Sequence, residues 1–558
     1  DDGPAGGTDD YAIHTSQSED LAIDIIPEYI DEQKIYLVAY PTVYVGIGRR
    51  KPDVNKAIID AINNGTLVLN YVGHGAPKFW AHEYVFETAV AVPQMTNKNY
   101  FMLTAATCDF GRFDDPTSQS GTEDMLNKQG AGAISAFTAT RVVGSTDNAA
   151  LNSLFYTNLF KVHQMGGSSD RIGLAYMLTK QRRTNDNDER FILFGDPAVR
   201  LNLPKLPVSI DSLNGKSTTV QSQISALGTV KIKGTIRNEN NEITPVNGEA
   251  IVSVFDSKRY QSFPEMLNYT ITLQGGLIYR GRVSVTNGEF STEFVVPKDI
   301  SYENQKGKIV VYFYNDNTDG VGTVSNFTVG GTNTSVVNDG KGPEIEIYFD
   351  NENFQDAYLV NPNFTLIAKL NDQVGINTTG TGIGHKLEGI LNDDLNKTYD
   401  FTNYFVGDLN SGGKSGKVKY LFSSMEPGDY KIKVKAWDVF NNYSSQETYF
   451  TVVSADGGIA IRDVYNYPNP FASNTTFTFQ HNITGAINVK IRIYTIAGRM
   501  IKEITQNDLM NKFVRIDWDG RDEDGNAIGN GTYLYKMTVE SSDGKSKDSV
   551  LGKLAVIK

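Results

Sequence analysis

Two residues of this chain have side chains and positions suited to nucleophilic catalysis, and both follow an apolar run. Cys108, the only cysteine, comes after "YFMLTAAT", and His74 comes after "LVLNYVG". A lone cysteine forms no intrachain disulfide, so it is either an inert buried thiol or a nucleophile. If the two runs are neighbouring parallel strands, His74 can take the thiol proton and leave a thiolate that attacks a carbonyl carbon.

Residues around this pair fit the same chemistry. The small residues Gly73 and Gly75 let a substrate backbone approach, and the amides of Gly75 and Cys108 are placed to donate to a developing oxyanion. An acid would orient the histidine, and by position the candidates are Asp1 and Asp2. The sequence therefore predicts a nucleophile, a base and two oxyanion donors, with an acid from the start of the chain.

A structural interpretation competes with the catalytic one. A single buried cysteine is more often a small core residue, and a Gly-His-Gly turn is more often structural; the joint placement of both beyond strand ends favours catalysis. His14, which follows Asp9 and Asp10, is placed to line the same cleft. The other histidines are interpreted as a loop residue or as structural residues: His82, His163, His385 and His481.

Composition bounds the class of protein. At 558 residues the chain is long enough for three to five domains of roughly 100–200 residues each. A net charge of −13 argues against nucleic-acid binding, which needs a basic face. No apolar run approaches the ~18 residues of a membrane-spanning helix. The chain opens on "DDGPAGGTDD" with no signal peptide, which we interpret as a fragment that lacks its upstream part.

Hydrophobic periodicity changes near residue 205. Up to residue 203, strand-like and helix-like runs alternate as in an α/β domain with a parallel sheet. The predicted strands are 34–40, 66–72, 100–107, 131–137 and a last one in "RFILFG"; the predicted helices are 55–63, 122–128, 149–161 and 171–183. Beyond it, short alternating runs separated by Asn, Gly, Asp and Pro predict three β-sandwich modules, at 206–330, 343–454 and 459–558.

The first 203 residues resemble the gingipain family of cysteine peptidases. The resemblance is carried by "LNYVGHGAPKFW", "FMLTAATCDFGRF", "GAGAISAFTATR" and "LFGDPAVRL". It implies a caspase-like catalytic domain in which a parallel sheet is flanked by helices, with His74 as general base and Cys108 as nucleophile. The family's acid lies in an acid-Gly-Gly-Pro loop, so "DDGP" makes Asp1 its counterpart and Asp2 the rival. An acid that selects basic substrate side chains in some members falls near Asp10.

The β modules carry a second resemblance. "VGINTTGTGIGHKLEGIL" with "KAWDVFNN" is similar to a segment of the gingipain-like sortases of the type IX secretion system, and residues 459–558 resemble the Ig-like C-terminal sorting domain of its cargo. These sortases imply a cysteine endopeptidase at the outer membrane, on the cell surface of a Gram-negative bacterium. It would cleave the sorting domain from cargo through a thioester and transfer the cargo to anionic lipopolysaccharide. An outer-membrane β-barrel would anchor it through the C-terminal module.

Two alternatives stay open at this point. One is a secreted gingipain-like protease of general specificity, and the other is a surface scaffold or binding protein without catalytic activity. The chemistry requires no cofactor and no metal. The acids of "DWDGRDEDGN", Asp519, Asp522 and Asp524, do not have the D-x-D-x-D-G spacing of a calcium loop, so we predict a polar turn there and leave calcium binding by the β modules open.

Overall fold

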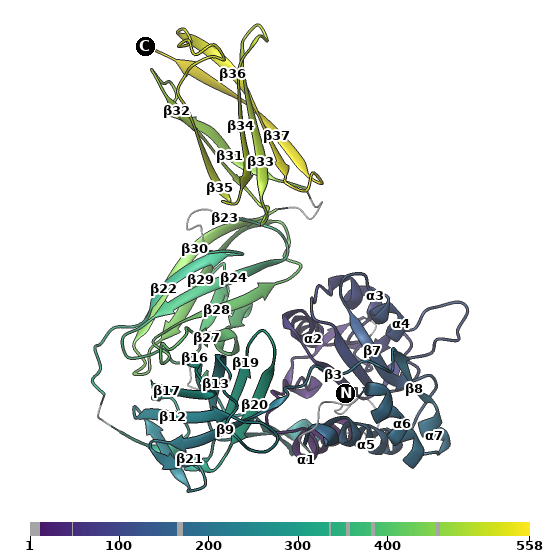
Figure 1. Ribbon diagram of the computed structural model, residues 1–558. Helices are drawn as coiled ribbons and strands as arrows, with labels where there is room; N and C mark the ends of the chain where they lie inside the picture. Colours follow the sequence, from purple (N-terminus) through teal and green to yellow (C-terminus); the bar gives the residue numbers. More distant parts are fainter. Residues whose placement is uncertain are drawn as a thin grey trace. The chain divides into compact units, whose positions relative to one another are not determined.

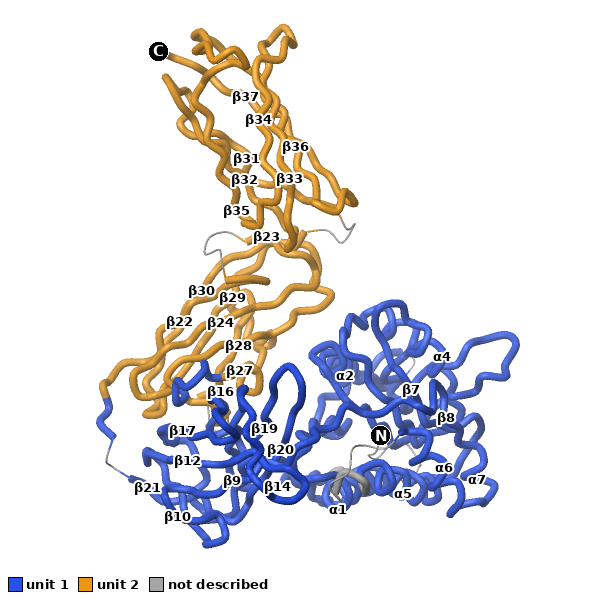
Figure 2. Tube along the Cα trace, viewed as in Figure 1, with its two compact units in different colours: residues 1–338, 407–413 blue, residues 339–406, 414–558 orange. Residues whose placement is uncertain are grey.

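The computed structural model describes residues 12–46, 48–164, 171–333, 336–352, 358–380, 385–453 and 458–558. The chain divides into two compact units, one of residues 1–338 with 407–413 and one of residues 339–406 with 414–558 (Figure 2). The first unit holds an α/β domain and a β module, and the second holds two further β modules (Figure 1). The predicted fold class, a caspase-like α/β domain followed by β-sandwich modules, is confirmed.

A four-stranded sheet is the centre of the α/β domain, and its strands follow the order β3, β6, β7, β8. These are β3 (Val68–Val72), β6 (Phe101–Ala106), β7 (Ala133–Ala139) and β8 (Phe191–Gly195). The first three run parallel, whereas β8 is antiparallel to β7, so the prediction of a parallel sheet is wrong for this last strand. Two long helices separate β7 from β8 and return the chain to the edge where β7 ends. There the Thr140 amide donates to the Arg190 carbonyl at 2.9 Å.

Helices cover both faces of this sheet. Every residue of β6 is buried, because one of its faces packs against α2 and the other against α5 and α6. The helices are α1 (Ile13–Asp24), α2 (Pro52–Asn64), α3 (Thr88–Ala91), α4 (Gly121–Leu126), α5 (Ser145–Gln164), α6 (Ile172–Arg182) and α7 (Asp186–Glu189). Short strands and 3₁₀ turns complete the domain: β1 (Val43–Val45), β2 (Gly48–Arg50), β4 (Gly75–Ala76), β5 (Phe79–Trp80), η1 (Leu37–Ala39) and η2 (Val92–Gln94).

Helix α2 shows how the sequence sets an element boundary here. Pro52 occupies its first turn, where a missing amide costs no hydrogen bond, and Asp53 favours the positive end of the helix dipole. The helix stops at Gly65, whose φ of 109° lies in a region open to glycine. Val54, Ile58 and Ile62 then lie on one buried face. The chain leaves α2 directly into β3, the strand that precedes His74.

The predicted strand 34–40 is wrong. Residues 31–36 have no regular structure, and Leu37–Ala39 form the 3₁₀ turn η1. The alternation that suggested a strand reflects burial on two sides of the segment. Leu37 joins the core of the α/β domain, while Tyr36 and Val38 pack against the hairpin of β14 (Arg259–Phe263) and β15 (Tyr269–Leu273) in the first β module. Hydrophobic periodicity reports which side chains are buried, and this segment is partly buried without pairing with any strand of the described chain.

The first β module is a sandwich with one apolar core. Seven of its strands form a sheet with the order β17, β12, β9, β20, β19, β13, β16, and β11, β21 and β18 form a second sheet. Alternate residues of β12 and β17 are buried, as expected for strands that face a core on one side. The elements are β9 (Leu206–Leu213), β10 (Lys216–Ser217), β11 (Ser222–Ala226), β12 (Thr229–Ile236), β13 (Gly248–Phe255), β14 (Arg259–Phe263), η3 (Pro264–Met266), β15 (Tyr269–Leu273), β16 (Leu277–Val285), β17 (Glu289–Val295), β18 (Gln305–Lys306), β19 (Lys308–Tyr314), β20 (Asp319–Val324) and β21 (Phe327–Thr332).

The second unit contains two more sandwiches, each with its own core. The first has β22 (Glu344–Phe349), β23 (Tyr358–Val360), β24 (Phe364–Asn371), β25 (Glu388–Leu391), η4 (Leu395–Lys397), β26 (Thr398–Asp400), η5 (Thr402–Tyr404), β27 (Phe405–Gly407), β28 (Ser415–Phe422), β29 (Gly428–Trp437) and β30 (Tyr443–Val452). The last has β31 (Ile461–Tyr467), β32 (Thr475–His481), β33 (Ile487–Thr495), β34 (Met500–Leu509), β35 (Phe513–Trp518), β36 (Gly531–Ser541) and β37 (Lys547–Val556), in sheets β31-β32-β35 and β34-β33-β36-β37.

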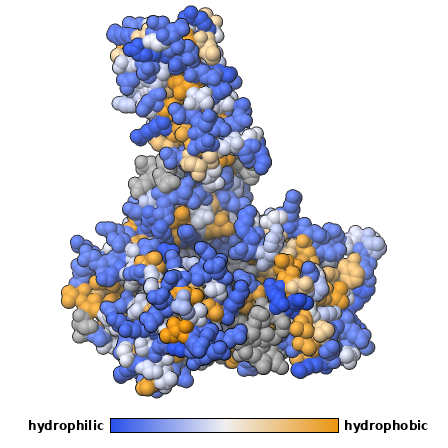
Figure 3. Space-filling view, in the orientation of Figure 1, coloured by the Kyte–Doolittle hydropathy of each residue, from blue (hydrophilic) through white to orange (hydrophobic). Residues whose placement is uncertain are grey.

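The surface agrees with the acidic, polar composition. On the face drawn in Figure 3, hydrophilic side chains predominate and hydrophobic ones form scattered patches. Such scattered apolar side chains are normal for a folded chain. Among the described residues, no helix combines the length and apolar character that a membrane crossing requires.

A buried carboxylate joins α1 to the first β module. Glu19 is 2% exposed. Its Oε1 atom lies 2.6 Å from the Lys34 ammonium and accepts a 2.7 Å hydrogen bond from the Tyr36 hydroxyl, and its Oε2 atom accepts one of 2.7 Å from the Thr272 amide in β15. Every partner is a donor, so the charge is well compensated. This clamp fixes the helix that carries His14.

Replacing Glu19 by alanine is expected to destabilise α1 by about 3–5 kcal/mol, because it leaves a buried Lys34 charge without its partner. Native-state hydrogen exchange of the α1 amides measures this local free energy of opening. Asp60→Ala is the matched control, since it removes an i,i+4 pair with the exposed Lys56 and should cost less than about 0.5 kcal/mol. Equal effects of the two changes would contradict the assignment of a buried clamp.

Candidate active site

The strand register brings the two predicted catalytic residues to one edge of the sheet. Strands β3 and β6 are parallel neighbours, and Val72 is paired with Ala106 at their carboxyl ends. His74 and Cys108 each follow two residues beyond this pair. The Gly73 amide extends the contact by donating to the Ala106 carbonyl at 3.4 Å. The neighbouring strands that the catalytic hypothesis required are therefore present.

The loops that carry the two residues touch each other. A Cβ atom built on Gly75 would lie 2.3 Å from the Oγ1 atom of Thr107 and 3.0 Å from its Cγ2 atom. Real Cβ atoms essentially never come that close to another heavy atom. Glycine at position 75 is thus a requirement of the close approach between the histidine loop and the cysteine loop.

A short hairpin fixes the backbone of His74. The His74 carbonyl accepts hydrogen bonds from the Tyr71 hydroxyl at 2.7 Å and from the Ala81 amide at 2.9 Å. Beneath it, the buried Trp80 indole stacks on the Tyr71 ring with centroids 4.4 Å apart and an interplanar angle of 6°. This stack anchors the β4–β5 hairpin, which begins at Gly75. The backbone on both sides of His74 is therefore held in place.

The Cys108 thiol rests against the segment that follows β7. Its Sγ atom lies 3.5 Å from the carbonyl oxygen of Val143 and 3.4 Å from the amide nitrogen of the same residue. Burial raises the pKa of the Cys108 thiol, the Val143 amide lowers it, and the charge of Asp109 raises it. Burial is the largest effect, so the resting group is a neutral thiol that needs a base before it can react.

Three histidine rings gather at this edge. The buried His14 ring meets His74 edge-on with centroids 5.2 Å apart, and the exposed His82 ring lies 4.6 Å from His74. The Ser145 hydroxyl lies 3.4 Å from the Nδ1 atom of His14. His14 was predicted to line the cleft and is next to the candidate base. The sequence assigned no role to His82, because only the β4–β5 hairpin folds it back onto His74.

The two predicted oxyanion donors are placed at the same edge. Gly75 faces Trp80 in the β4–β5 hairpin, and the Trp80 amide donates to the Val85 carbonyl at 2.8 Å instead of to Gly75. Because the Ala81 amide donates to the His74 carbonyl, His74 and Ala81 form a hydrogen-bonded pair of the hairpin. Hydrogen-bonded and non-hydrogen-bonded pairs alternate, so the next pair, Gly75 and Trp80, is not hydrogen-bonded and the Gly75 amide points away from the hairpin. Within the described ranges, the Cys108 amide donates to no backbone carbonyl.

The predicted acids Asp1, Asp2 and Asp10 lie outside the described residues. Of the acids near the histidine cluster in sequence, Glu83 is buried and lies 2.7 Å from the Arg49 guanidinium, so its charge is already paired. Across the described ranges, no three His, Cys, Asp or Glu side chains are grouped so that they could hold a metal ion.

A charged cleft of about 470 Å³ adjoins the cysteine loop. It lies where β7 ends and β8 begins, beyond Cys108 along the same sheet edge, and the Asp109 amide donates to the Arg141 carbonyl at 3.3 Å. The lining residues are Phe113, Asp114, Thr140, Arg141, Asp186, Glu189 and Arg190. A peptide lying along the edge would pass the candidate nucleophile and then meet these acidic and basic side chains.

The histidine of β32 has a structural environment. His481 is fully buried, and burial lowers its pKa to about 4. Its Nε2 atom donates to the Asn511 carbonyl at 2.9 Å while its Nδ1 atom accepts from the Ile483 amide at 3.2 Å, so the ring is neutral. The His385 ring contacts that of Trp437 with centroids 4.4 Å apart and a tilt of 52°, and the side chain of His163 is outside the described part.

In the acidic turn "DWDGRDEDGN" of the last module, carboxylates accept hydrogen bonds from backbone amides of the same turn. The carboxylate of Asp519 accepts from the Arg521 amide at 3.1 Å, and that of Asp522 accepts from the Asn526 amide at 2.8 Å. These short-range bonds are those of a polar turn.

Comparison with protein families places the N-terminal part of the chain. The sequence profile described as peptidase family C25 matches residues 1–202. This part of the chain is therefore similar to peptidase family C25. The profile of the FlgD Ig-like domain matches residues 467–543, in agreement with the Ig-like sandwich at the C-terminus. The predicted gingipain-like cysteine peptidase domain is thereby confirmed, while the roles of single residues remain predictions.

Solved structures give weaker similarities. Dimeric latent PorU from Porphyromonas gingivalis is 27% identical over 76% of this chain and 41% of its own, with a TM-score of 0.30. FdeC, an Escherichia coli adhesin, is 10% identical over 63% of this chain and 97% of its own, with a TM-score of 0.16. This chain thus spans less than half of the PorU chain. Among curated proteins, none matches the chain at a significant level.

Proposed function

We propose that this protein is a cell-surface cysteine endopeptidase that cleaves the C-terminal sorting domain from type IX secretion cargo and passes the cargo to an acceptor amine. The observation that carries the catalytic part is the placement of His74 and Cys108 beyond the ends of two paired parallel strands within a C25 domain. The substrate and the transfer step are supported by the sequence motifs of the β modules.

The reaction begins with proton transfer from the Cys108 thiol to His74. Because burial holds the thiol neutral, the base is needed to form the thiolate. The sulfur then attacks the scissile carbonyl carbon, and the amides of Gly75 and Cys108 donate to the negative oxygen of the tetrahedral intermediate. When this intermediate collapses, the C–N bond breaks, protonated His74 gives its proton to the leaving amine, and a thioester on Cys108 remains.

The second half of the reaction decides between hydrolysis and transfer. Attack of water on the thioester would release the cargo as a carboxylate, whereas attack of an amine would form a new amide. In both cases His74 accepts the proton of the nucleophile, and the Cys108 thiol is restored. The proposed acceptor is an amine of anionic lipopolysaccharide. An acid from Asp1 or Asp2 would orient His74, Asp10 would contribute to substrate selection, and His14 would line the same site.

The sorting role rests on two parts of the chain outside the catalytic domain. The motif "VGINTTGTGIGHKLEGIL" follows β24 and ends with β25, and an Ig-like module follows at residues 467–543. We propose that this last module binds an outer-membrane β-barrel anchor and keeps the enzyme at the cell surface. A secreted protease of general specificity would use the last module only as its own export tag and would not need the motif.

Mass spectrometry of a purified cargo protein tests this function. After incubation with wild type, we expect loss of the sorting domain, and with a primary amine present we expect the cargo to gain the mass of that amine as an amide. Cys108→Ala, the matched control, should leave cargo intact. Cleavage without amine incorporation would restrict the function to hydrolysis, and cleavage by Cys108→Ala would contradict the thioester route.

A further inference from the structure

We propose that Asn187 is a positioning residue of the active site, because it holds the segment that contacts both the Cys108 thiol and His14. The inference rests on the proposed roles of Cys108 and His74 in catalysis. Asn187 lies on the short helix α7, far from both in sequence, and it does not touch the reacting atoms. It acts through the backbone of Gly144.

The segment 143–145 touches the active site at both of its ends. At one end, the amide and carbonyl of Val143 lie 3.4 and 3.5 Å from the Cys108 Sγ atom. At the other end, the Ser145 hydroxyl lies 3.4 Å from the His14 ring, whose edge meets His74. A shift of this segment would therefore move the partner of the thiol and the neighbour of the candidate base together.

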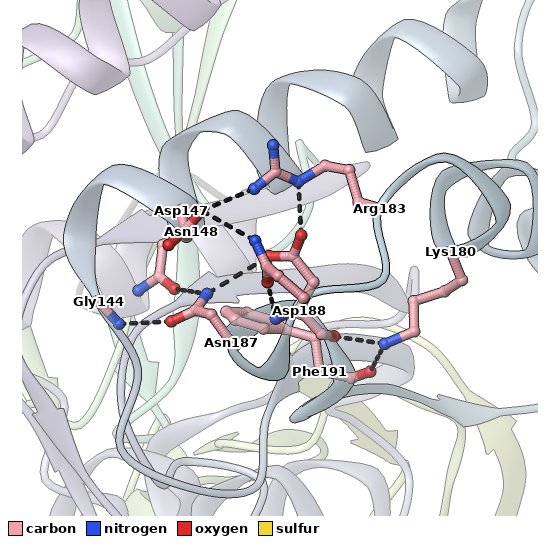
Figure 4. A network of polar contacts seen from close by, with 9 residues as sticks. Gly144, Asp147, Asn148, Lys180, Arg183, Asn187, Asp188 and Phe191 are labelled. Carbon is pink, nitrogen blue, oxygen red and sulfur yellow. Dashed lines mark hydrogen bonds and ion pairs between the residues drawn. The ribbon is translucent and has the colours of Figure 1, made fainter.

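Asn187 fixes the middle of the segment. The Gly144 amide donates to the Oδ1 atom of Asn187 at 2.6 Å (Figure 4). The Nδ2 atom of the same side chain donates to Asn148 at 3.1 Å and to the Asp188 carboxylate at 3.4 Å. A carboxylate only accepts, so the amide nitrogen must face Asp188, and this leaves the oxygen to face Gly144. The orientation of the Asn187 side chain is set by its own partners.

Helix α7 is itself held firmly from the other side. Asp188 is fully buried and bound by the Nε atom of Arg183 at 2.5 Å, and Arg183 also reaches Asp147 in α5 at 2.9 Å. The helix starts at the Asn185 cap, which accepts from the Asp188 amide at 2.8 Å and donates to Asp147 at 3.0 Å. Figure 4 shows this network reaching from α6 through α7 to Gly144. It is a rigid support of the kind that catalytic geometry requires.

Alkylation of Cys108 by iodoacetamide tests the proposal on the full chain, because Cys108 is the only thiol. In Asn187→Ala the segment loses its anchor, and we expect alkylation at pH 7 to slow about tenfold, since loss of the Val143 amide contact removes a bond that favours the thiolate. For the same reason the pH midpoint of alkylation should move upward. Asp109, the charged residue whose charge raises the pKa of the thiol, is unchanged in this variant.

Two variants separate positioning from general support. Asn185→Ala removes the cap of the same helix but touches nothing in segment 143–145, so it should lower thermal stability and leave the alkylation rate within about twofold of wild type. Asn187→Gln keeps both an oxygen that can accept from the Gly144 amide and a nitrogen that can donate to Asp188, and it should retain the rate within about threefold. If Asn187→Ala does not fold, Asn187→Gln decides the outcome.

The proposal is overturned if Asn187→Ala keeps the wild-type rate and midpoint, if both alanine variants slow alkylation equally, or if Asn187→Gln is as slow as Asn187→Ala. A failure of the proposed function looks different. In that case His74→Ala would be alkylated at the wild-type rate, and the wild-type thiol would show no dependence on the histidine at all.

Discussion

Replacing His74 by alanine is expected to lower the rate of peptide-bond cleavage by about 10³-fold, because it removes the group that takes the thiol proton and later protonates the leaving amine. Burial raises the pKa of Cys108, so little thiolate forms at neutral pH without a base. The same variant should therefore also slow alkylation of Cys108 at pH 7. Single-turnover cleavage of a cargo protein and iodoacetamide labelling measure the two effects.

His82→Ala is the matched control for this prediction. The His82 ring lies 4.6 Å from His74 but is exposed and does not follow a strand of the sheet. We expect this change to affect cleavage by less than about tenfold, the size of effect that a nearby residue without proton transfer can have. If His82→Ala lost as much activity as His74→Ala, the base would have to be reassigned within the cluster.

The site pair was predictable because each of its residues follows a strongly patterned element. An apolar run that ends in Gly-His-Gly and another that ends in Thr-Cys both predict strands, and parallel strands present their carboxyl ends at one edge. The structure adds the strand register, in which Val72 pairs with Ala106. His74 and Cys108 each follow this pair by two residues. No sequence pattern encodes that register directly.

Elements that depend on distant partners were harder to predict. The run at 34–40 alternates like a strand, yet its side chains bind Glu19 and the β14–β15 hairpin. Strand β8 has the composition of a parallel strand, and only the return of the chain along α6 makes it antiparallel. In both cases the local pattern reports burial, and the tertiary arrangement decides what buries the residues.

Asn187 illustrates a third limit. Asparagine next to aspartate in a loop is ordinary turn chemistry, and nothing in "TNDNDER" distinguishes position 187 from position 185. Their difference arises only because α7 packs beside α5 and presents one side chain to Gly144. Supporting residues of this kind are visible only when the backbone they hold is seen next to the thiol.

Gly75→Ala is expected to lower cleavage by about 10²-fold, because a displacement of about 1 Å in catalytic geometry has an effect of that size. The new Cβ atom would lie 2.3 Å from the Thr107 Oγ1 atom, so the histidine and cysteine loops must move apart. Thr107 is fully buried, and in the described part of the chain its hydroxyl makes no hydrogen bond. Removing that hydroxyl and its methyl group should therefore relieve the clash at little cost.

A double-mutant cycle tests this steric account. Thr107→Ala alone should stay near wild-type activity, and Gly75→Ala with Thr107→Ala should recover part of the lost rate, since only the Cβ contact at 3.2 Å remains. Gly46→Ala, where nothing lies within 4 Å of the added atom, is the control for glycine replacement in the same domain. Additive effects of the two changes would mean that the clash with Thr107 does not cause the loss, and that the distance between the loops is not set by the absence of a side chain at Gly75.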